Sequence, residues 1–474
     1  MDPWLKPALD YIPQWLGFQM RASEQPGCAI AIAHEGRVVL ERAFGHADLA
    51  HAEALTPRHR FRVASHSKSF TAAGIMLLRE QGRLTLDDAI GKYVTGLRKE
   101  VASVTIAQLL SHSAGLTRDG PDSGQFADRI PYRSAADLLA DLGAPPPIEP
   151  GTRFKYSNHG FALLGMAMAA ITGEDYARWI RREVIAAAGL RETEPAMPAR
   201  PGVPFARGHS EKLLLRRRLV IPADNDAHAI GPAAGFTATA ADLTRFFWQL
   251  APQAKRSFLS VASRREMVRR QWRNPDSMFE TYYGLGTISG TLGGWDWVGH
   301  SGGWQGVLTR AVAVPKQGLS VAVLTNAQDA TPAPWLDGIL HILRLYAENG
   351  PPVRRVSGWT GRWWSLGGAV DLVPAGEKLF VASPGLFNPL MDASEIEVTG
   401  RDSGRIALAQ GFGSHGESVR RVRDAKGQVS EVWLGGGRLL AEPAAAKDLL
   451  ARYDASAAKA KARAPHPPSS RSAR

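Results

Sequence analysis

Two residues three positions apart, Ser65 and Lys68, could supply a nucleophile and its base. They lie in residues 63–78, where a strand end turns into a largely apolar stretch that predicts a helix, and side chains three apart share a helix face. A serine hydroxyl is a poor nucleophile at neutral pH unless a base lies within hydrogen-bond reach. A lysine amine can be that base where burial or a neighbouring cation keeps it unprotonated. The alternative is a serine that caps the helix, followed by an ordinary surface lysine.

Two further segments carry groups that acyl transfer needs. Tyr156 offers a phenol that can shuttle a proton, and Asn158 offers an amide that can bind a substrate carbonyl. The segment His300-Ser301-Gly302-Gly303 lies between two predicted strands. Its glycines let a substrate approach the backbone closely, and its N–H groups can stabilise an oxyanion.

In this order, the motifs resemble those of the penicillin-recognising serine hydrolases, which comprise class C β-lactamases, D,D-carboxypeptidases, D-aminopeptidases and related carboxylesterases. The chain combines the Ser-x-x-Lys pair with the Tyr-x-Asn form of the companion motif. The resemblance extends over roughly residues 20–345, where Leu109–Leu116 and Gly235–Leu243 also resemble connecting segments of the family. It favours the catalytic interpretation of Ser65 over the helix cap.

The resemblance implies a role for each residue of the site. Ser65 would attack the carbonyl and form an acyl-enzyme, while Lys68 and Tyr156 would share the work of general base. Tyr156 would then protonate the leaving group, and Asn158 would hold the substrate amide oxygen. The oxyanion hole would consist of the backbone N–H groups of Ser65 and Gly303. A neutral Lys68 or an ionised Tyr156 is needed at working pH, and the sequence leaves both open.

His300 departs from the commonest family pattern, in which Lys-Thr-Gly occupies this place. A permanent ammonium suits a substrate carboxylate, whereas a histidine is only partly charged near pH 7. Peptidases and esterases of the family often carry histidine here, so the departure disfavours a dedicated β-lactamase. The sequence has no separate Glu motif for a deacylating water, so hydrolysis would rely on Tyr156 and Lys68, with His300 as a further candidate.

We therefore expect a serine hydrolase that cleaves a small peptide, amide or ester, most in keeping with a peptidase or amidase of the D-aminopeptidase or D,D-carboxypeptidase type. One alternative is a carboxylesterase of the same family. Another is a penicillin-binding or sensor protein that acylates without efficient turnover. A dead scaffold would have lost Ser65, Lys68 or Tyr156, and the chain keeps all three.

Other polar and aromatic residues have simpler interpretations. We expect His66 to lie on a helix surface, the alternative being that it lines the site, and His112 to tie down a turn. We expect Arg216–Arg218 to belong to a solvated loop, the alternative being that they attract an anionic substrate. The Trp359–Trp364 cluster is typical of aromatic packing in a β domain. We expect no cofactor and no metal site, because the remaining histidines, such as His159 and His228, have no ligand-spaced partners.

The elements that position these residues predict an α+β domain over residues 1–350. It would be a β-lactamase/transpeptidase-like domain, with an antiparallel sheet flanked by helices and a helical subdomain, because strands from both ends of the region must meet in one sheet. An amphipathic helix at residues 3–19 and a hairpin turning at residues 34–36 open it, and a helix at Trp335–Glu348 closes it. The later strands are expected at Tyr282–Ser289, Trp295–Gly299, Gly306–Val314 and Leu319–Thr325.

The sequence pattern changes after Pro351-Pro352. Residues 353–454 offer short alternating segments with glycine turns, which predict a small all-β accessory domain, in the form of a barrel. Similar barrels cover the catalytic cleft in the D-aminopeptidases, and that role is a hypothesis for this chain. Residues 455–474, rich in Ala, Lys, Arg, Pro and Ser, are predicted to form a disordered basic tail.

Composition excludes several other classes. The chain of 474 residues has 57 Lys and Arg against 45 Asp and Glu, a net charge of +12, but nothing resembles a nucleic-acid module. No run approaches the length of a membrane-spanning helix, and the N-terminus lacks signal-peptide features. The single Cys28 cannot form an intrachain disulfide. We expect a cytoplasmic protein that meets a small-molecule or short-peptide substrate.

Overall fold

A computed structural model describes residues 2–197, 202–410 and 413–463. The chain folds into two compact units. One contains residues 20–337. The other combines residues 1–19 with residues 338–474, so it includes most of the N-terminal helix. The domain limits expected from the sequence, with one domain ending at residue 350 and the next beginning at residue 353, stay a prediction.

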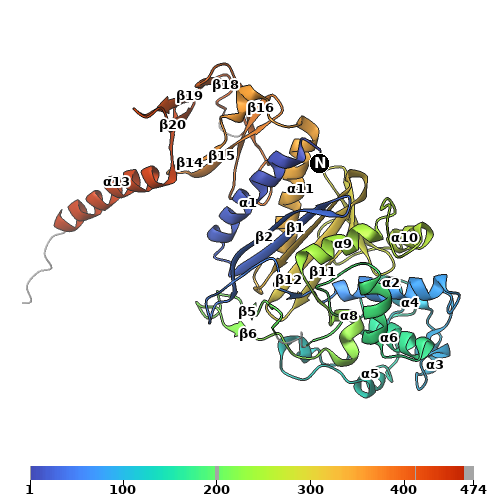
Figure 1. The fold of residues 1–474 in the computed structure, drawn as a ribbon. Helices are drawn as coiled ribbons and strands as arrows, with labels where there is room; N and C mark the ends of the chain where they lie inside the picture. The colour runs from blue at the N-terminus through green and yellow to red at the C-terminus, as the bar shows by residue number, and fades with distance from the viewer. Residues whose placement is uncertain (1, 198–201, 411–412, 464–474) are drawn as a thin grey trace, which may run out of the picture. The chain divides into compact units, whose positions relative to one another are not determined.

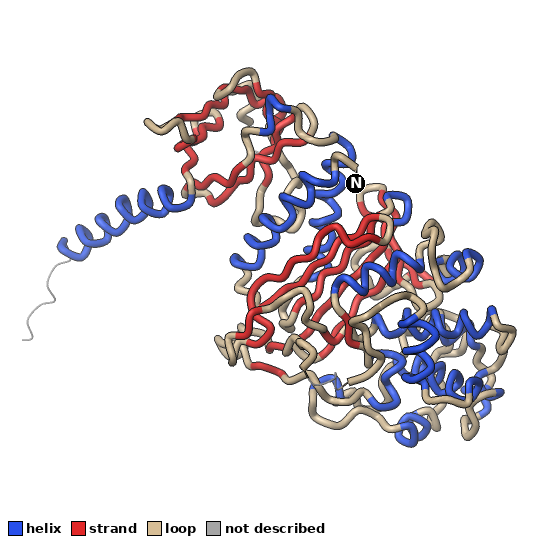
Figure 2. The backbone as a smooth tube through the Cα atoms, in the orientation of Figure 1, coloured by secondary structure: helices blue, strands red, loops and turns tan. Residues whose placement is uncertain are grey.

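The unit of residues 20–337 is built around an antiparallel sheet, which has nine strands in the described part of the chain (Figure 2). In spatial order these are β3 (Glu53–Ala54), β2 (Arg37–Asp48), β1 (Gly27–His34), β13 (Leu319–Thr325), β12 (Val307–Val314), β11 (Trp295–Trp304), β10 (Ile288–Leu292), β9 (Thr281–Tyr283) and β8 (Trp272–Arg273). β1 pairs with both β2 and β13. Strands from the two ends of the unit therefore meet at the middle of one sheet, as predicted.

The hairpin of β1 and β2 forms at the predicted turn. Glu35 and Gly36 both have positive φ angles, 48° and 80°. Two left-handed residues in a row give the turn whose twist matches paired strands. The small and aliphatic side chains of Cys28–Ala33 are buried throughout, which suits a strand with neighbours on both edges and packing on both faces.

The helices that carry the site pack against one another beside the sheet (Figure 1). α2 (His66–Glu80) is buried along most of its length and contacts α6 (Asn158–Thr172) and α8 (Gly231–Ala234). α9 (Ala240–Leu250) packs on β1, β12 and β13, and Thr239 caps its start by accepting from the Asp242 N–H. The shorter helices of this unit include α3 (Lys99–Ala102), α4 (Ile106–Leu110), α5 (Ala135–Asp141), α7 (Tyr176–Ile180) and α10 (Val261–Val268).

Aromatic stacking fixes α2 in place. The Phe70 ring lies between those of Phe246 and Phe236, with centroid distances of 3.7 Å and 4.7 Å. All three side chains are fully buried. Burial of such a side chain stabilises the fold by about 1.5–3 kcal/mol, so the helix carrying Lys68 is held rigidly.

The second unit contains a closed antiparallel barrel, as predicted. Its eight described strands are β14 (Gly361–Ser365), β15 (Gly368–Ala375), β16 (Lys378–Ala382), β17 (Ser394–Val398), β18 (Ser403–Leu408), β19 (Ser418–Arg423), β20 (Val429–Leu434) and β21 (Gly437–Leu440). Trp359 and Trp363 are buried in its core, which is the packing role expected for that cluster. α1 (Leu5–Ala22) joins this unit, because the Tyr11 hydroxyl donates to Asp371 at 2.9 Å.

Two expectations about elements need correction. The strand expected at Tyr282–Ser289 is interrupted, because only its ends belong to β9 and β10. The tail expected to be disordered begins as helix, since α13 covers Glu442–Arg463, and residues 464–474 lie outside the described residues. The helix that the periodicity of residues 175–188 predicts is present, and α7 continues directly into a π-helical turn at Arg181–Ala186.

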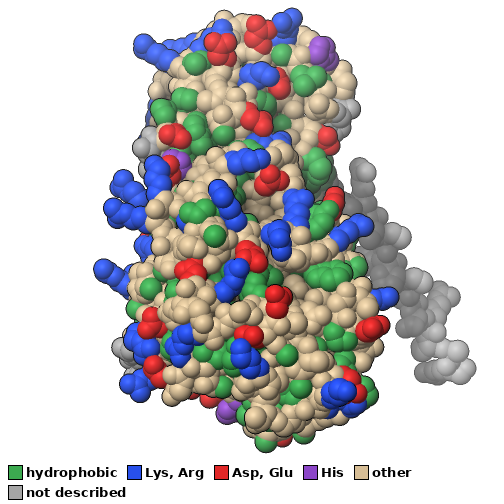
Figure 3. All heavy atoms as spheres, turned by 90° about the vertical axis from the view of Figure 1, so that its right-hand side faces the viewer, with side chains coloured by type: hydrophobic (Ala, Val, Ile, Leu, Met, Phe, Trp, Pro, Cys, Tyr) green, Lys and Arg blue, Asp and Glu red, His purple; other side chains and the backbone are tan. Residues whose placement is uncertain are grey.

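Two broader features bear on partners. None of the helices in the described ranges is both long and apolar enough to cross a membrane. On the face shown in Figure 3, Lys and Arg side chains are interspersed with Asp and Glu side chains. That face therefore lacks the continuous basic stripe on which a nucleic acid would lie. The cytoplasmic location stays a prediction.

Candidate active site

Ser65 lies where a strand turns into a helix. β4 (Phe61–Arg62) leads into the turn, Ala64 has a left-handed φ of 44°, and α2 begins at His66. Such a φ is uncommon for a residue with a side chain and is often retained at functional sites. The neighbouring Ser67 supports the turn, because its hydroxyl donates to the Ala64 carbonyl at 2.5 Å.

Ser65 occupies the N-cap position of α2, yet its side chain makes no capping hydrogen bond to the described helix. The helix-cap interpretation therefore lacks the bond that it requires. The residue is half-buried, so its hydroxyl is neither lost in the core nor fully solvated. Its side-chain contacts run instead to Lys68 and Tyr156.

Lys68 is fully buried, and three oxygen atoms surround its amine. Nζ lies 3.1 Å from Ser65 Oγ, 2.6 Å from Asn158 Oδ1 and 2.8 Å from the Ala233 carbonyl oxygen. Burial lowers the pKa of Lys68 well below its ordinary value of 10.5, and the nearby Arg118 lowers it further, while Asp119 opposes the shift. The arrangement therefore favours a neutral amine.

A neutral amine can form a hydrogen bond with each of these three oxygen atoms. It has two N–H groups, which can be donated to Asn158 Oδ1 and to the Ala233 carbonyl, neither of which can donate in return. At 3.1 Å, Nζ can donate to Ser65 Oγ, and once the amine is neutral its lone pair can instead accept the Ser65 hydroxyl proton. This is the arrangement in which Lys68 can take the serine proton.

Tyr156 lies close to both Ser65 and Lys68. Its ring centroid is 4.8 Å from Lys68 Nζ. Burial raises the pKa of Tyr156 above its ordinary value of 10, although a hydrogen bond with Ser65 and the charge of Arg118 work against the shift. The phenol therefore keeps its proton at neutral pH and can donate it.

Asn158 is held by bonds at both ends of its amide. Its Oδ1 accepts from Lys68, and its Nδ2 donates to Asp119 Oδ1 at 2.5 Å. The second Oδ atom of the buried Asp119 pairs with Arg118 Nε at 3.0 Å. Nδ2 thus keeps one N–H that no described residue accepts, and a substrate carbonyl could take it.

Sequence reasoning missed Asp119, since nothing in its surroundings distinguishes it from other loop carboxylates. Residues 117–120 follow α4 and lie against the start of α6. There the Ser157 hydroxyl donates to the Thr117 carbonyl at 2.6 Å, and the Asn158 N–H donates to the Arg118 carbonyl at 2.9 Å. The loop therefore fastens the residue that carries the amide.

His112 also binds the residues just before α6. Its Nδ1 accepts from the Ser157 N–H at 3.1 Å, so it ties down a turn as expected. Its ring also lies 4.1 Å from the Tyr156 ring and 4.6 Å from the Tyr283 ring, measured between centroids. Burial lowers the pKa of His112, so its uncharged ring lines the site.

The His300–Gly303 segment lies inside a strand and not between strands, which corrects the expectation. β10 pairs with β11 no further than Gly299, whereas β12 pairs with it through Trp304. The last part of β11 therefore has one edge without a strand neighbour, and its N–H and C=O groups are available there. Ser301 and Gly303 are exposed.

Gly302 lets this edge approach the nucleophile turn. A Cβ atom at this position would lie 2.2 Å from the Val63 carbonyl oxygen, a distance that no side chain tolerates. Val63 precedes Ser65 by two residues, so the close contact brings the Gly303 backbone into the neighbourhood of Ser65. The oxyanion hole formed by the N–H groups of Ser65 and Gly303 remains a proposal.

His300 is neutral, and not partly charged as its type suggests. Burial lowers its pKa to about 3, and Lys68 contributes to the shift. Nε2 lies 3.0 Å from the Tyr283 hydroxyl, and Nδ1 lies 2.7 Å from the Ser301 carbonyl. Tyr283, on β9, was not predicted, because an aromatic residue in a strand is ordinarily core.

His66 is fully buried and does not lie on the helix surface as expected. Its ring lies 6.0 Å from that of His300 and 5.5 Å from that of Phe247. Neither ring nitrogen has a hydrogen-bond partner among the described residues. Burial lowers the pKa of His66 well below 6.5, so a third neutral imidazole, after those of His112 and His300, lies at the start of α2.

The remaining candidates lie apart from this cluster. Arg218 is mostly buried and pairs with Asp329 at 2.5 Å, whereas Arg216 and Arg217 are exposed, so the solvated-loop expectation holds for part of that segment. His159 Nε2 lies 2.9 Å from Asp141. Within the described ranges, no group of three or more His, Cys, Asp or Glu side chains could hold a metal ion.

Comparison with known sequences places this geometry in context. A sequence model of the family described as Beta-lactamase matches residues 17–341. Penicillin-binding protein 4* of Bacillus subtilis (strain 168) is 32% identical over 171 residues, which cover 35% of this chain and 37% of that protein. The aligned part is thus about a third of the length of the curated relatives that the chain matches.

Solved structures extend the likeness to the second unit. The octameric penicillin-binding protein homologue from Pyrococcus abyssi superposes with a TM-score of 0.63 at 21% identity, over 91% of this chain and 99% of that one. At that identity, the likeness shows the fold. A D-stereospecific amidohydrolase from Streptomyces sp. superposes with a TM-score of 0.56 at 25% identity, over 66% of this chain and 93% of that one.

Proposed function

The chain belongs to the beta-lactamase family of serine hydrolases, and from this premise we propose that it cleaves a small peptide or amide through an acyl-enzyme on Ser65. The observation that carries the proposal is the set of partners around Lys68 Nζ. Burial of the amine lowers the pKa of Lys68 and favours its neutral form, in which two N–H groups satisfy the two carbonyl-type acceptors and the lone pair can accept the Ser65 proton.

The proposed reaction begins as Lys68 takes that proton and Ser65 Oγ bonds to the substrate carbonyl carbon. The carbonyl electrons move to oxygen, and the N–H groups of Ser65 and Gly303 stabilise the oxyanion. Tyr156 donates its proton to the leaving amine as the C–N bond breaks. Lys68 then returns the proton to Tyr156, so both groups regain their starting states.

Deacylation follows the same course with water as the nucleophile and Ser65 as the leaving group. Lys68 takes a proton from water while the water oxygen bonds to the acyl carbon. Tyr156 donates its proton to Ser65 Oγ as the ester bond breaks, the free carboxylic acid is released, and Lys68 returns its proton to Tyr156. His300 is neutral and bound to Tyr283, so we assign it to the wall of the site and not to the proton path.

The neutral His300 also bears on the substrate. A cation at this place would bind a substrate carboxylate strongly, and a neutral imidazole supplies at most a hydrogen bond. This supports an amide or aminopeptidase-type substrate over a β-lactam or a peptide whose terminal carboxylate must be held there. The likeness to a D-stereospecific amidohydrolase supports the same class of substrate.

A carboxylesterase is the second candidate, because a site without a carboxylate-binding cation suits esters as well. Steady-state turnover of a small panel by the purified protein distinguishes the two. The panel contains D- and L-aminoacyl nitroanilides, a short-chain nitrophenyl ester and nitrocefin, and Ser65→Ala is the control. We expect D-aminoacyl nitroanilides to be cleaved fastest, with an acyl adduct on Ser65 detected by mass spectrometry.

Each other outcome has a definite meaning. Turnover of the ester alone would replace the amidase proposal with the esterase. A stoichiometric burst that then stalls would indicate a protein that acylates without turnover. Activity that survives in Ser65→Ala would overturn the assignment of the nucleophile.

A further inference from the structure

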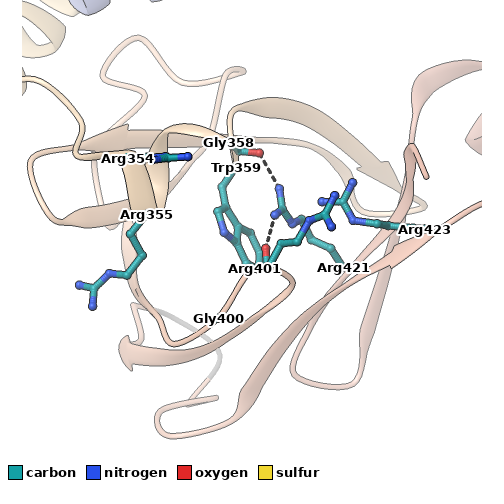
Figure 4. A pocket seen from close by; sticks show the side chains of 8 residues that line it. All are labelled: Arg354, Arg355, Gly358, Trp359, Gly400, Arg401, Arg421 and Arg423. Atoms are coloured by element: carbon teal, nitrogen blue, oxygen red, sulfur yellow. Dashed lines mark hydrogen bonds between the residues drawn. The ribbon is translucent and has the colours of Figure 1, made fainter. Parts of the chain in front are cut away.

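The barrel unit contains a hollow that the hydrolase chemistry does not use. It has a volume of about 470 Å³, within the range of roughly 300–1,000 Å³ found for small-molecule sites. Its lining residues all belong to this unit and are shown in Figure 4: Arg354, Arg355, Gly358, Trp359, Gly400, Arg401, Arg421 and Arg423. We call this hollow the arginine pocket.

The arginine pocket is strongly cationic. Among the described residues, the ion pairs of its five arginines run to a single carboxylate, Asp402, which lies 2.8 Å from Arg423 and 3.1 Å from Arg421. Arg354, Arg355 and Arg401 are exposed, and none of them lies within 4 Å of a carboxylate in the described chain. Most of the positive charge is thus left without a counter-charge.

Arg421 builds the rim of the arginine pocket. Its guanidinium donates to the Gly358 carbonyl at 2.5 Å and to the Arg401 carbonyl, and it stacks 4.0 Å above the Trp359 ring (Figure 4). These bonds join the end of the short helix α12 (Arg354–Ser357) to the turn between β17 and β18. The side chain is only 7% exposed, so the rim is fixed before any ligand arrives.

The guanidinium groups of Arg401, Arg421 and Arg423 lie near one another (Figure 4). Burial lowers the pKa of Arg421, Asp402 opposes this shift, and the charges of Arg423 and Arg401 add to it. Holding like charges together costs free energy unless an anion joins them. The buried indole N–H of Trp359 likewise has no acceptor among the described residues. The arginine pocket therefore combines fixed donors with uncompensated charge.

We propose that the arginine pocket binds a ligand that carries two or more phosphate groups. A guanidinium fork matches the oxygen spacing of phosphate and can bind it through two parallel bonds. Closely spaced phosphates concentrate more negative charge in a small volume than single carboxylates do, and five guanidinium groups favour such a ligand. A soluble polyphosphorylated molecule and the headgroup of a phospholipid that carries two or more phosphates share this chemistry.

Calorimetric titration of the full chain with tripolyphosphate at low ionic strength tests the proposal. The variant Arg354→Gln/Arg401→Gln removes two exposed guanidiniums and leaves the Arg421 rim intact. Its matched control, Lys378→Gln/Arg438→Gln, removes two cations of the barrel that pair with Glu395 and Glu431 outside the arginine pocket. We expect the dissociation constant to rise at least tenfold in the pocket variant and to stay within about twofold in the control.

Flotation with vesicles separates the two sources of phosphate. Phosphatidylinositol bisphosphate in phosphatidylcholine is compared with phosphatidylcholine alone, for the same three proteins. If the full chain binds tripolyphosphate and the pocket variant does not, the result supports a soluble ligand. If the full chain binds only the anionic vesicles and the pocket variant does not bind them, the result supports a headgroup. The proposal is overturned if the full chain binds neither probe, or if the pocket variant and the control bind alike. Denaturant unfolding of both variants with a midpoint like that of the unsubstituted chain verifies that they fold.

Discussion

Lys68 illustrates how one buried group can decide the chemistry of a site at the scale of single residues. A lysine in solution is protonated at neutral pH and cannot act as a base. Here burial disfavours the ammonium, and the partners Asn158 Oδ1 and the Ala233 carbonyl both demand a donor. The tyrosine beside it is shifted in the opposite sense, so the site holds a neutral base and a neutral acid together. Environments that push two pKa values apart in this way are typical of acid–base pairs.

Asp119 acts on this pair through charge as well as position. Its carboxylate raises the pKa of Lys68 and orients Asn158. We predict that Asp119→Asn lowers kcat/KM by about ten- to a hundredfold, because the Asn158 amide loses its charged acceptor. Because the pKa of Lys68 then falls, the acid limb of the kcat/KM profile moves to lower pH.

The pH profile distinguishes this role from a merely structural one. Asp137→Asn, at an exposed carboxylate on α5, is the control and leaves the profile in place. A drop in rate with an unmoved acid limb would contradict the electrostatic coupling between Asp119 and Lys68.

At the scale of elements, the site depends on the contact between β11 and the turn before α2. That contact exists because position 302 has no side chain: a Cβ there would meet the Val63 carbonyl at 2.2 Å. Neither element can give way easily, since β11 is paired with β12 along its whole length at this end and α2 is buried among aromatic rings. The glycine is therefore a requirement of the geometry between elements.

We predict that Gly302→Ala lowers the free energy of unfolding by about 1–3 kcal/mol and reduces turnover, since β11 must move away from the nucleophile turn. Gly303→Ala is the comparison, because its added Cβ would meet the flexible end of Leu308 at 3.4 Å. Denaturant unfolding measures the difference. Equal destabilisation by the two substitutions would rule out the Val63 contact as the cause.

At the scale of the whole molecule, the buried neutral histidines make stability depend on pH. His66, His112 and His300 all have pKa values lowered by burial, whereas in the unfolded chain each returns to about 6.5. The unfolded state therefore binds more protons below that pH. The stability gained from keeping these rings neutral is present above pH 6.5 and is lost as the pH falls.

We predict that the free energy of unfolding falls between pH 7.5 and pH 5, with each histidine contributing up to about 1.4 kcal/mol per pH unit below pH 6.5. His66→Leu tests this, because it removes a ring without hydrogen-bond partners among the described residues and replaces it with an apolar side chain. Denaturant titrations at the two pH values should show a smaller loss in the variant. A loss as large as that of the unsubstituted chain would contradict the role of His66.

Much of the architecture follows from patterns that are local in the sequence. An apolar run and the turn residues after it define the β1–β2 hairpin, and the Ser-x-x-Lys spacing brings Ser65 and Lys68 together because both belong to one helix start. The motif order indicated the family and its fold, and glycine-punctuated segments indicated the barrel. These properties depend on neighbours a few residues away, which the sequence displays directly.

Tertiary structure alone decided what depends on distant packing. Asp119 meets Asn158, Tyr283 meets His300, and the Ala233 carbonyl meets Lys68, although no local pattern links the members of these pairs. The burial of His66 and the extension of β11 through His300 likewise arise from contacts between elements. Protonation states followed from the same cause, because desolvation is set by everything that surrounds a group and not by its place in the chain.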